Sequence, residues 1–183
     1  MMLRVRILLV VAASLAVGCT VSEPNRNPMG ETFPSVKGES LKKTSVELPK
    51  DVLGKPSILM VGYVQNTQFD LDRWTLGLVQ AGAEVKILEV PVIPAGFPSA
   101  FLRGTIDNGM RAGIPSEDWG GVVTIYGSDA AKIAKFTGTQ NPRNGRMLLL
   151  DKDGVVRWFW DQGYSAKRVL ELTKLANEMQ ASE

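Results

Sequence analysis

The feature that most constrains the fold is an apolar run, Ser57 to Val64, that ends abruptly in the polar stretch Gln65 to Gln68. An uninterrupted apolar run of strand length is typical of a strand buried on both faces, as in sheets with parallel strands. The residues that follow, from about Gln68 to Ala81, have the spacing of an amphipathic helix that ends at Gly82. Because ligands of such folds bind beyond the carboxyl ends of the strands, the polar stretch is a candidate site.

The rest of the chain alternates between strand-like and helix-like segments, which predicts an α/β fold with a mostly parallel sheet covered on both faces. A hairpin that turns at Gly38 precedes the first buried strand. After the first helix we expect a strand over 83–92, a helix over 99–111, a strand over 119–127 and a short helix over 128–136. Two strands joined by a turn at Asp153 and Gly154 follow, and then a closing helix over 166–179.

The amino terminus has the pattern of a secretory signal peptide, because Arg4 and Arg6 precede an apolar run that stops at Gly18 and Cys19. The run covers only about half of a hydrocarbon core of roughly 30 Å, so a membrane-spanning helix is the weaker interpretation. A polar stretch with two prolines follows, which is typical of an extended tether. We therefore divide the chain into a signal peptide (1–18), a tether (19–32) and one domain (33–183).

Residues up to Cys19 resemble the lipobox of bacterial lipoproteins, in which the cysteine after the cleavage site carries acyl chains such as palmitate. Cys19 is the only cysteine, so no disulfide can form within the chain, and acylation would account for an unpaired cysteine in an exported protein. Several acyl chains would hold the protein stably at a lipid bilayer. Since Thr20 follows the cysteine where Gram-negative sorting signals can carry aspartate, the resemblance implies the periplasmic face of the outer membrane. The alternative is an ordinary signal peptide with a chance cysteine.

Composition excludes several functional classes. Removal of residues 1–18, with their two arginines, leaves 19 basic and 19 acidic residues, so nothing predicts nucleic-acid binding. The chain has no histidine, which excludes imidazole catalysis and the commonest zinc ligand. With a single cysteine as well, the chain cannot build a metal site from nitrogen and sulfur ligands. We expect no metal and no cofactor.

The order of elements and three motifs resemble the peroxiredoxin-type branch of the thioredoxin fold. The motifs are GETFPSVKGESL at 30–41, SILMVGYV at 57–64 and MLLLDKDGVVRW at 147–158. The resemblance implies a thioredoxin-like three-layer α/β fold, with a central mixed sheet, helices on both faces and an amino-terminal hairpin.

On this pattern Thr67 falls near the nucleophilic cysteine of the family, Asp70 near its second cysteine, and Arg146 at the place of a cis-proline. The attacking species of that chemistry is a thiolate. A threonine hydroxyl forms no disulfide and here has no histidine to activate it, so we predict neither disulfide exchange nor peroxide reduction. The segment 136–158 is also similar to the mitochondrial ATP-synthase assembly factor family, which implies a role in assembly or protein contact.

Two groups of residues are candidates for function. A possible ligand crevice, where amides at a helix start would favour an anion, comprises Gln65, Asn66, Thr67, Gln68, Arg143 and Arg146. The other interpretation is that Thr67 caps the helix and the arginines face solvent. A possible protein contact comprises Arg157, Trp158 and Trp160, with both tryptophans on one face of a strand. We expect binding, with a protein partner or a small ligand, and keep as the alternative an unrecognised enzyme that uses Thr67, Asp70 or Arg146.

Overall fold

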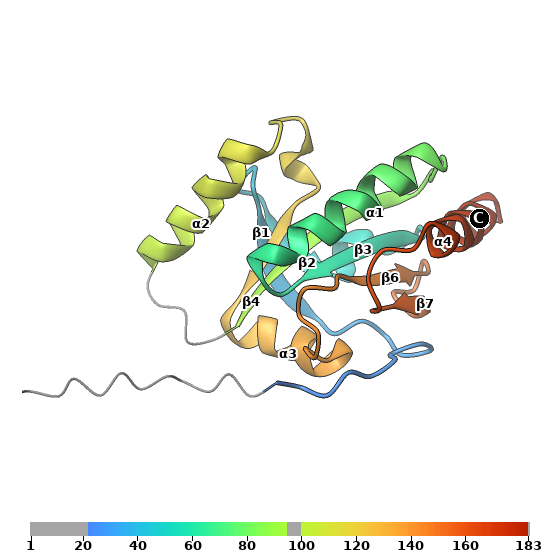
Figure 1. Ribbon diagram of the computed structural model, residues 1–183, viewed down its shortest axis with the longest axis horizontal. Coiled ribbons are helices and arrows are strands. Elements are labelled where there is room, and N and C mark those ends of the chain that lie inside the picture. Colours follow the sequence, from blue (N-terminus) through green and yellow to red (C-terminus); the bar gives the residue numbers. More distant parts are fainter. Residues whose placement is uncertain (1–21, 95–99, 183) are drawn as a thin grey trace, which may run out of the picture.

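The computed structural model describes residues 22–94 and 100–182. They form a seven-stranded sheet in the order β2-β1-β5-β4-β3-β6-β7 with helices around it (Figure 1). The signal peptide and Cys19 lie outside the described residues. Within the described ranges, every helix is too short or too polar to cross a membrane.

The strands are β1 (Val36–Ser40), β2 (Ser45–Leu48), β3 (Ser57–Gly62), β4 (Lys86–Pro94), β5 (Val123–Tyr126), β6 (Arg146–Leu150) and β7 (Val156–Trp160). The helices are α1 (Gln68–Gln80), α2 (Ala100–Gly113), α3 (Gly127–Thr137) and α4 (Ala166–Ala181), with short 3₁₀ turns η1 (Lys50–Val52), η2 (Gln65–Thr67) and η3 (Asp118–Gly120). The neighbours β3, β4 and β5 run parallel, whereas the other pairs are antiparallel. The predicted mixed sheet and amino-terminal hairpin are therefore confirmed. The expectation of a mostly parallel sheet is wrong, because only two of the six neighbouring strand pairs are parallel.

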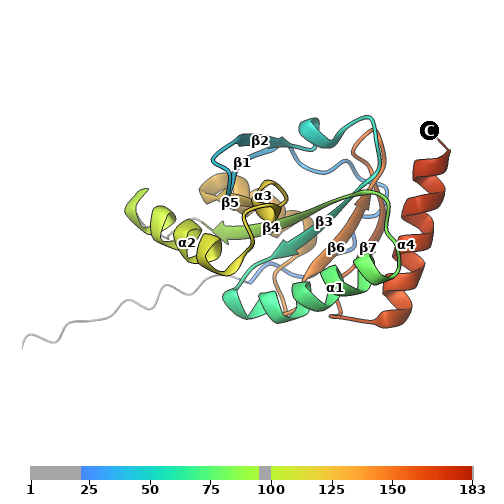
Figure 2. The ribbon, with the colours of Figure 1, turned by 90° about the horizontal axis from the view of Figure 1, so that it is seen from above.

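Two apolar cores lie on opposite faces of the sheet. One packs the sheet against α3 and contains Phe33 and Phe136, whose rings meet edge to face. The other packs the sheet against α1 and α4, which lie next to each other (Figure 2), and contains Trp74 and Leu172. Every residue of β3, which lies between β4 and β6, is buried. Burial on both faces explains why this strand is uniformly apolar in the sequence.

The predicted turn at Gly38 is wrong. Gly38 lies inside β1, and the chain turns over residues 41–44, where Lys43 has a φ of 63°. A Cβ atom on residue 38 would lie 2.4 Å from Ile125 Cδ1 and 2.7 Å from the carbonyl oxygen of Thr124. The glycine therefore allows β1 to approach β5 closely, a requirement that only the packed sheet reveals.

Candidate functional site

The predicted crevice at the start of α1 is largely filled by its own side chains. Thr67 is only 1% exposed. Its hydroxyl donates to the carbonyl oxygen of Pro142 at 2.7 Å and accepts from the N–H of Val64 at 3.2 Å. The side chain makes no capping hydrogen bond to α1. Thr67 therefore ties the η2 turn to the loop before β6.

The other members of the polar stretch lie at the surface. Gln65, Asn66 and Gln68 are exposed, and the side-chain amide of Gln68 donates to Asp72 at 2.8 Å. The Thr67 hydroxyl is already engaged by Pro142 and Val64, so it is not part of this exposed polar surface.

Asp70 joins three elements that are distant in sequence. Its Oδ2 accepts from the N–H of Gly145 at 2.8 Å, and its Oδ1 accepts from the N–H of Tyr164 at 2.7 Å. A Cβ atom on residue 145 would lie 2.4 Å from Met147 Cε and 2.5 Å from Leu71 Cδ2, so a larger residue here would displace these two side chains. At the place of the family's second cysteine, Asp70 therefore holds α1 to the starts of β6 and α4. No local sequence pattern marks this role.

Arg146 is fully buried at the start of β6. Its Nη1 donates to the carbonyl oxygens of Asn141 at 3.2 Å and Asn144 at 2.6 Å, and its Nη2 donates to the carbonyl oxygen of Gln140 and to Asn25 Oδ1. Burial lowers the pKa of Arg146, and the charges of Tyr63, Asp161 and Asp70 oppose that shift. This guanidinium thus neither faces solvent nor opens toward Gln65, whereas Arg143 on the same loop is exposed.

Tyr63 lies beside this guanidinium, whose carbon is 5.4 Å from the centre of the tyrosine ring. The Tyr63 hydroxyl donates to the carbonyl oxygen of Ile133 at 3.1 Å and shares a 2.6 Å hydrogen bond with the Thr137 hydroxyl. Burial raises the pKa of Tyr63 to about 12, although the hydrogen bond with Thr137 and the charge of Arg146 lower it. The tyrosine is therefore neutral across the physiological range.

Part of the predicted tether lies over Arg146. We call residues 23–32 the strap. Glu23 and Thr139 are joined by two hydrogen bonds, from the N–H of Thr139 to the carbonyl oxygen of Glu23 and from the N–H of Glu23 to the Thr139 hydroxyl. The Asn25 side chain accepts from Arg146 at 3.1 Å and donates to Asp161 at 2.9 Å. The strap therefore supplies one of the hydrogen-bond partners of the buried guanidinium, whose Nε has no partner among the described residues.

The rest of the strap continues along the domain. The N–H of Gly30 donates to the carbonyl oxygen of Val156, and the N–H of Val156 donates to the carbonyl oxygen of Glu31. At Gly138, with a φ of 76°, a Cβ atom would lie 2.3 Å from Asn25 Cα and 2.4 Å from the Pro24 carbonyl oxygen. Residues 23–32 thus pack against the domain that the sequence predicts to begin at Phe33.

A groove of about 450 Å³ runs between the strap and the last strand. It is lined by Asn25, Arg26, Asn27, Met29, Trp158, Phe159, Trp160, Asp161, Gln162 and Arg168. A sheet face presents alternate residues, whereas here consecutive residues from Trp158 to Gln162 line the groove, so it follows the edge of β7. β7 ends the sheet, and the strap hydrogen-bonds to its outer edge at Val156, the first residue of the strand.

The two tryptophans of the predicted protein contact lie on the same face of β7. Trp158 packs edge to face on Trp74, with ring centres 6.2 Å apart. The Trp160 indole N–H donates to the carbonyl oxygen of Gly163 at 2.7 Å, and the guanidinium of Arg168 lies 4.4 Å from its ring centre. Both side chains are half-buried, so each offers part of its ring to the groove.

Arg157, the third predicted contact residue, does not line the groove. It is exposed, and its Nε donates to Asp151 Oδ2 at 2.6 Å. Burial raises the pKa of the Asp151 carboxyl, but the N–H groups of Val155 and Asp153 and the charge of Arg157 outweigh burial and lower it. Arg157 and Asp151 thus stabilise the turn between β6 and β7.

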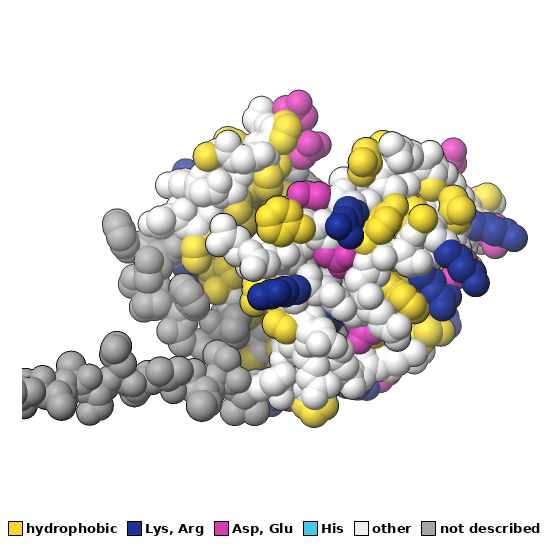
Figure 3. Space-filling model, in the orientation of Figure 1, with side chains coloured by type: hydrophobic (Ala, Val, Ile, Leu, Met, Phe, Trp, Pro, Cys, Tyr) yellow, Lys and Arg dark blue, Asp and Glu magenta, His cyan; other side chains and the backbone are white. Residues whose placement is uncertain are grey.

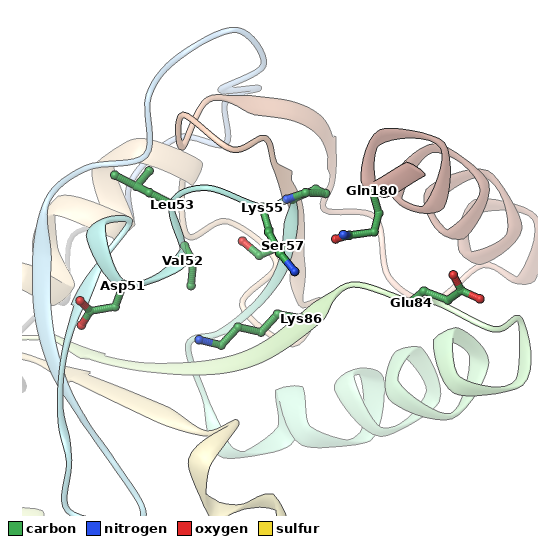
Figure 4. Close-up of a pocket in the computed structure, with 9 residues that line it drawn as sticks. Asp51, Val52, Leu53, Lys55, Ser57, Glu84, Lys86 and Gln180 are labelled. Atoms are coloured by element: carbon green, nitrogen blue, oxygen red, sulfur yellow. The ribbon is translucent and has the colours of Figure 1, made fainter. Parts of the chain in front are cut away.

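A second depression, of about 400 Å³, lies at the amino ends of β3 and β4 (Figure 4). Lys55, Ser57 and Gln180 point into it, whereas Asp51 and Glu84 point away. This is the opposite end of the strands from the one where α/β proteins bind their ligands. Its two lysines are also matched by two acidic residues, so it carries no excess charge.

In the described ranges, no three acidic, histidine or cysteine side chains come together as a metal-binding group. Copper prefers thiolate, thioether and imidazole ligands. The chain has no histidine, its only cysteine is Cys19, and Thr67 and Asp70 occupy the positions that the resemblance assigns to thiols. The residues around the start of α1 therefore do not fit a copper ion.

No protein-family model and no curated protein matches the chain. Solved structures do match. The copper-bound form of yeast Sco1 is 15% identical and aligns with a TM-score of 0.58 over 86% of this chain and 98% of its own. A SCO1/SenC family lipoprotein of Bacillus anthracis is 14% identical, with a TM-score of 0.54 over 84% and 99%.

The exposed lipoprotein thioredoxin Etrx1 of Streptococcus pneumoniae is 14% identical, with a TM-score of 0.52 over 78% of this chain and 99% of its own. At such identities the likeness extends to the fold and no further. Together with the mixed sheet and the helices on both of its faces, it shows that this chain has a thioredoxin-like fold.

Proposed function

We propose that this protein is a membrane-tethered lipoprotein whose thioredoxin-like domain carries no thiol chemistry and acts by protein contact or assembly. The acylated Cys19 would hold it in a lipid bilayer, at the periplasmic face of the outer membrane. Two of the structural neighbours are themselves lipoproteins, which supports a lipid-anchored bacterial protein.

One observation carries the choice of binding over catalysis. The side chains at the start of α1, where this fold places its thiols, are consumed by internal contacts: Thr67 by Pro142, and Asp70 by two backbone N–H groups. The groove along β7 is open by contrast, and its aromatic and arginine side chains are types enriched at protein interfaces. We assign the partner contact to this groove, with Trp158 and Trp160 in its wall.

Site-specific photocrosslinking in native membranes tests the contact. A photoreactive residue replaces Gln162, which is exposed in the groove, and in the control it replaces Glu178, which is exposed on α4 outside the groove. We expect a discrete protein adduct from position 162 and none from position 178. Equal labelling from both positions would refute the assignment of the groove.

Two further measurements test the other parts of the proposal. Mass spectrometry of the native protein should find acyl chains on Cys19, and Cys19→Ala should release the protein from membranes and lose the adduct. A purified domain that retains a small molecule, with no adduct from position 162, would support the ligand-binding alternative instead.

A further inference from the structure

Few residues separate the proposed anchor from the packed domain. Glu23 is already bound to Thr139 by two hydrogen bonds, and only residues 20–22 separate it from Cys19. At 3.3–3.6 Å per residue, this connection spans at most about 14 Å. Had all of residues 19–32 been free, as the sequence predicts, the reach would be roughly 45 Å.

The docked end of the strap lies close to the start of α1. Both segments bind to the loop before β6. The Thr139 hydroxyl of that loop accepts a hydrogen bond from the N–H of Glu23, and the Pro142 carbonyl oxygen accepts one from the Thr67 hydroxyl. Three residues of chain span about 10 Å. The start of α1 therefore cannot move more than roughly 25 Å from the backbone of Cys19, a distance smaller than the domain itself.

The outer side of α1 carries an unpartnered apolar stripe. Phe69, Leu76 and Val79 are 72%, 58% and 66% exposed, and Val64, just before the helix, is 43% exposed. Their spacing puts the three helical residues on one side of α1, where Figure 3 shows apolar side chains at the surface. Asp72 and Arg73 lie between them, so the stripe has no net charge.

We infer that this stripe, Phe69, Leu76 and Val79, rests on the lipid bilayer to which the chain is anchored. The inference rests on the proposed acylation of Cys19. The short connection keeps the start of α1, and with it Phe69, close to the bilayer surface. A weak contact between the stripe and the lipid therefore forms at a high effective concentration. Because Asp72 offsets Arg73, the contact needs no anionic lipid. The acyl chains hold the protein at the bilayer, and the stripe adds a second contact that fixes the orientation of the domain.

The single cysteine makes a direct test possible. Residues 19–183 are coupled through Cys19 to a maleimide lipid in phosphatidylcholine vesicles with brominated acyl chains, which quench tryptophan emission. Phe69→Trp is the probe variant. Leu170→Trp, at a side chain 64% exposed on α4, is the matched control. Relative to wild type, we expect the added emission at position 69 to shift to the blue and to be mostly quenched, and that at position 170 to be unaffected.

Equal quenching at positions 69 and 170, or none at either, would overturn the inference. So would a crosslink from position 69 in native membranes to a protein instead of lipid. Twelve Gly and Ser residues inserted after Thr20 should reduce the quenching at position 69, and unchanged quenching would overturn the role given to the strap.

Failure of the anchor proposal can be distinguished from failure of the present inference, because maleimide coupling to Cys19 does not depend on acylation in the cell. Quenching at position 69 with no acyl chain on native Cys19 refutes the anchor proposal alone. An acyl chain on Cys19 without quenching refutes the present inference alone.

Discussion

Replacement of Asp70 by alanine should destabilise the domain severely. The carboxylate accepts N–H groups from Gly145 at 2.8 Å and Tyr164 at 2.7 Å, and it connects α1 to segments 75 and 94 residues away. A hydrogen bond to a charged group contributes about 1.5–3 kcal/mol. Because the side chain is only half-buried, we take the lower end for each bond and expect a loss of about 3 kcal/mol.

Urea unfolding followed by tryptophan fluorescence measures this loss, since Trp74 is fully buried in the core beside α4. For a domain of this size, a loss of that magnitude lowers Tm by about 6–12 °C. Asp72→Ala is the matched control, because Asp72 is exposed and its partner Gln68 is a neighbour on the same helix. Its effect should stay within about 0.5 kcal/mol.

A loss below about 1 kcal/mol for Asp70→Ala, at an unchanged urea dependence, would show that Asp70 is not a structural bridge. The position of the family's second cysteine would then be open to a functional role, and the enzyme alternative would gain weight. Asp70→Asn separates charge from geometry, because the amide keeps one acceptor oxygen and should fall between wild type and alanine.

Three more outcomes follow from the same contacts. Since burial raises the pKa of Tyr63 from 10.0 to about 12, its contribution to stability is complete below pH 10 and is lost as pH rises through the folded value; Tyr63→Phe should flatten that alkaline loss in urea unfolding at a series of pH values. The pKa of Asp151 is lowered, so its contribution is present above the unfolded value of 3.8 and is lost as pH falls through the folded value; Asp151→Asn should remove that acid slope. Gly138→Ala should expel the strap, seen as faster proteolysis within residues 23–32, whereas Gly104→Ala, where no atom lies within 4 Å of the added Cβ, should not; equal cleavage of both variants would contradict the docking of Asn25 and Pro24.

The order of elements could be predicted because each follows from a local pattern. From Ile58 to Gly62 the run has no polar side chain on either face of the strand, which is the pattern of a strand buried on both faces. The helix after it is marked by its apolar spacing and by Gly82, which has a φ of 75°. Gly38 misled the prediction because a glycine serves a turn and a close strand contact equally well, and the two are distinguished only by Ile125 on β5.

The sequence could predict which residues lie near the start of the first helix, but not whether their side chains are free to bind a ligand. The thioredoxin-like resemblance brought Thr67, Asp70 and Arg146 to one end of the domain, where the structure has them. Whether they face a ligand depends on partners that no local pattern reveals: Pro142 for Thr67, Gly145 and Tyr164 for Asp70, and a ring of carbonyl oxygens for Arg146. A polar side chain at the surface and one that satisfies buried groups are identical in sequence.

What the sequence determined by itself is the order of the elements and the residue types available for chemistry, because hydrophobic periods and residue types are properties of the chain read in order. Only the tertiary structure decided which polar groups form internal hydrogen bonds, and that residues 23–32 pack against the domain. The strap docks through Asn25, whose side chain reaches Asp161, 136 residues later, and Arg146, 121 residues later. Contacts over such separations form only when the sheet has assembled, so no local sequence pattern shows that residues 23–32 pack against the domain.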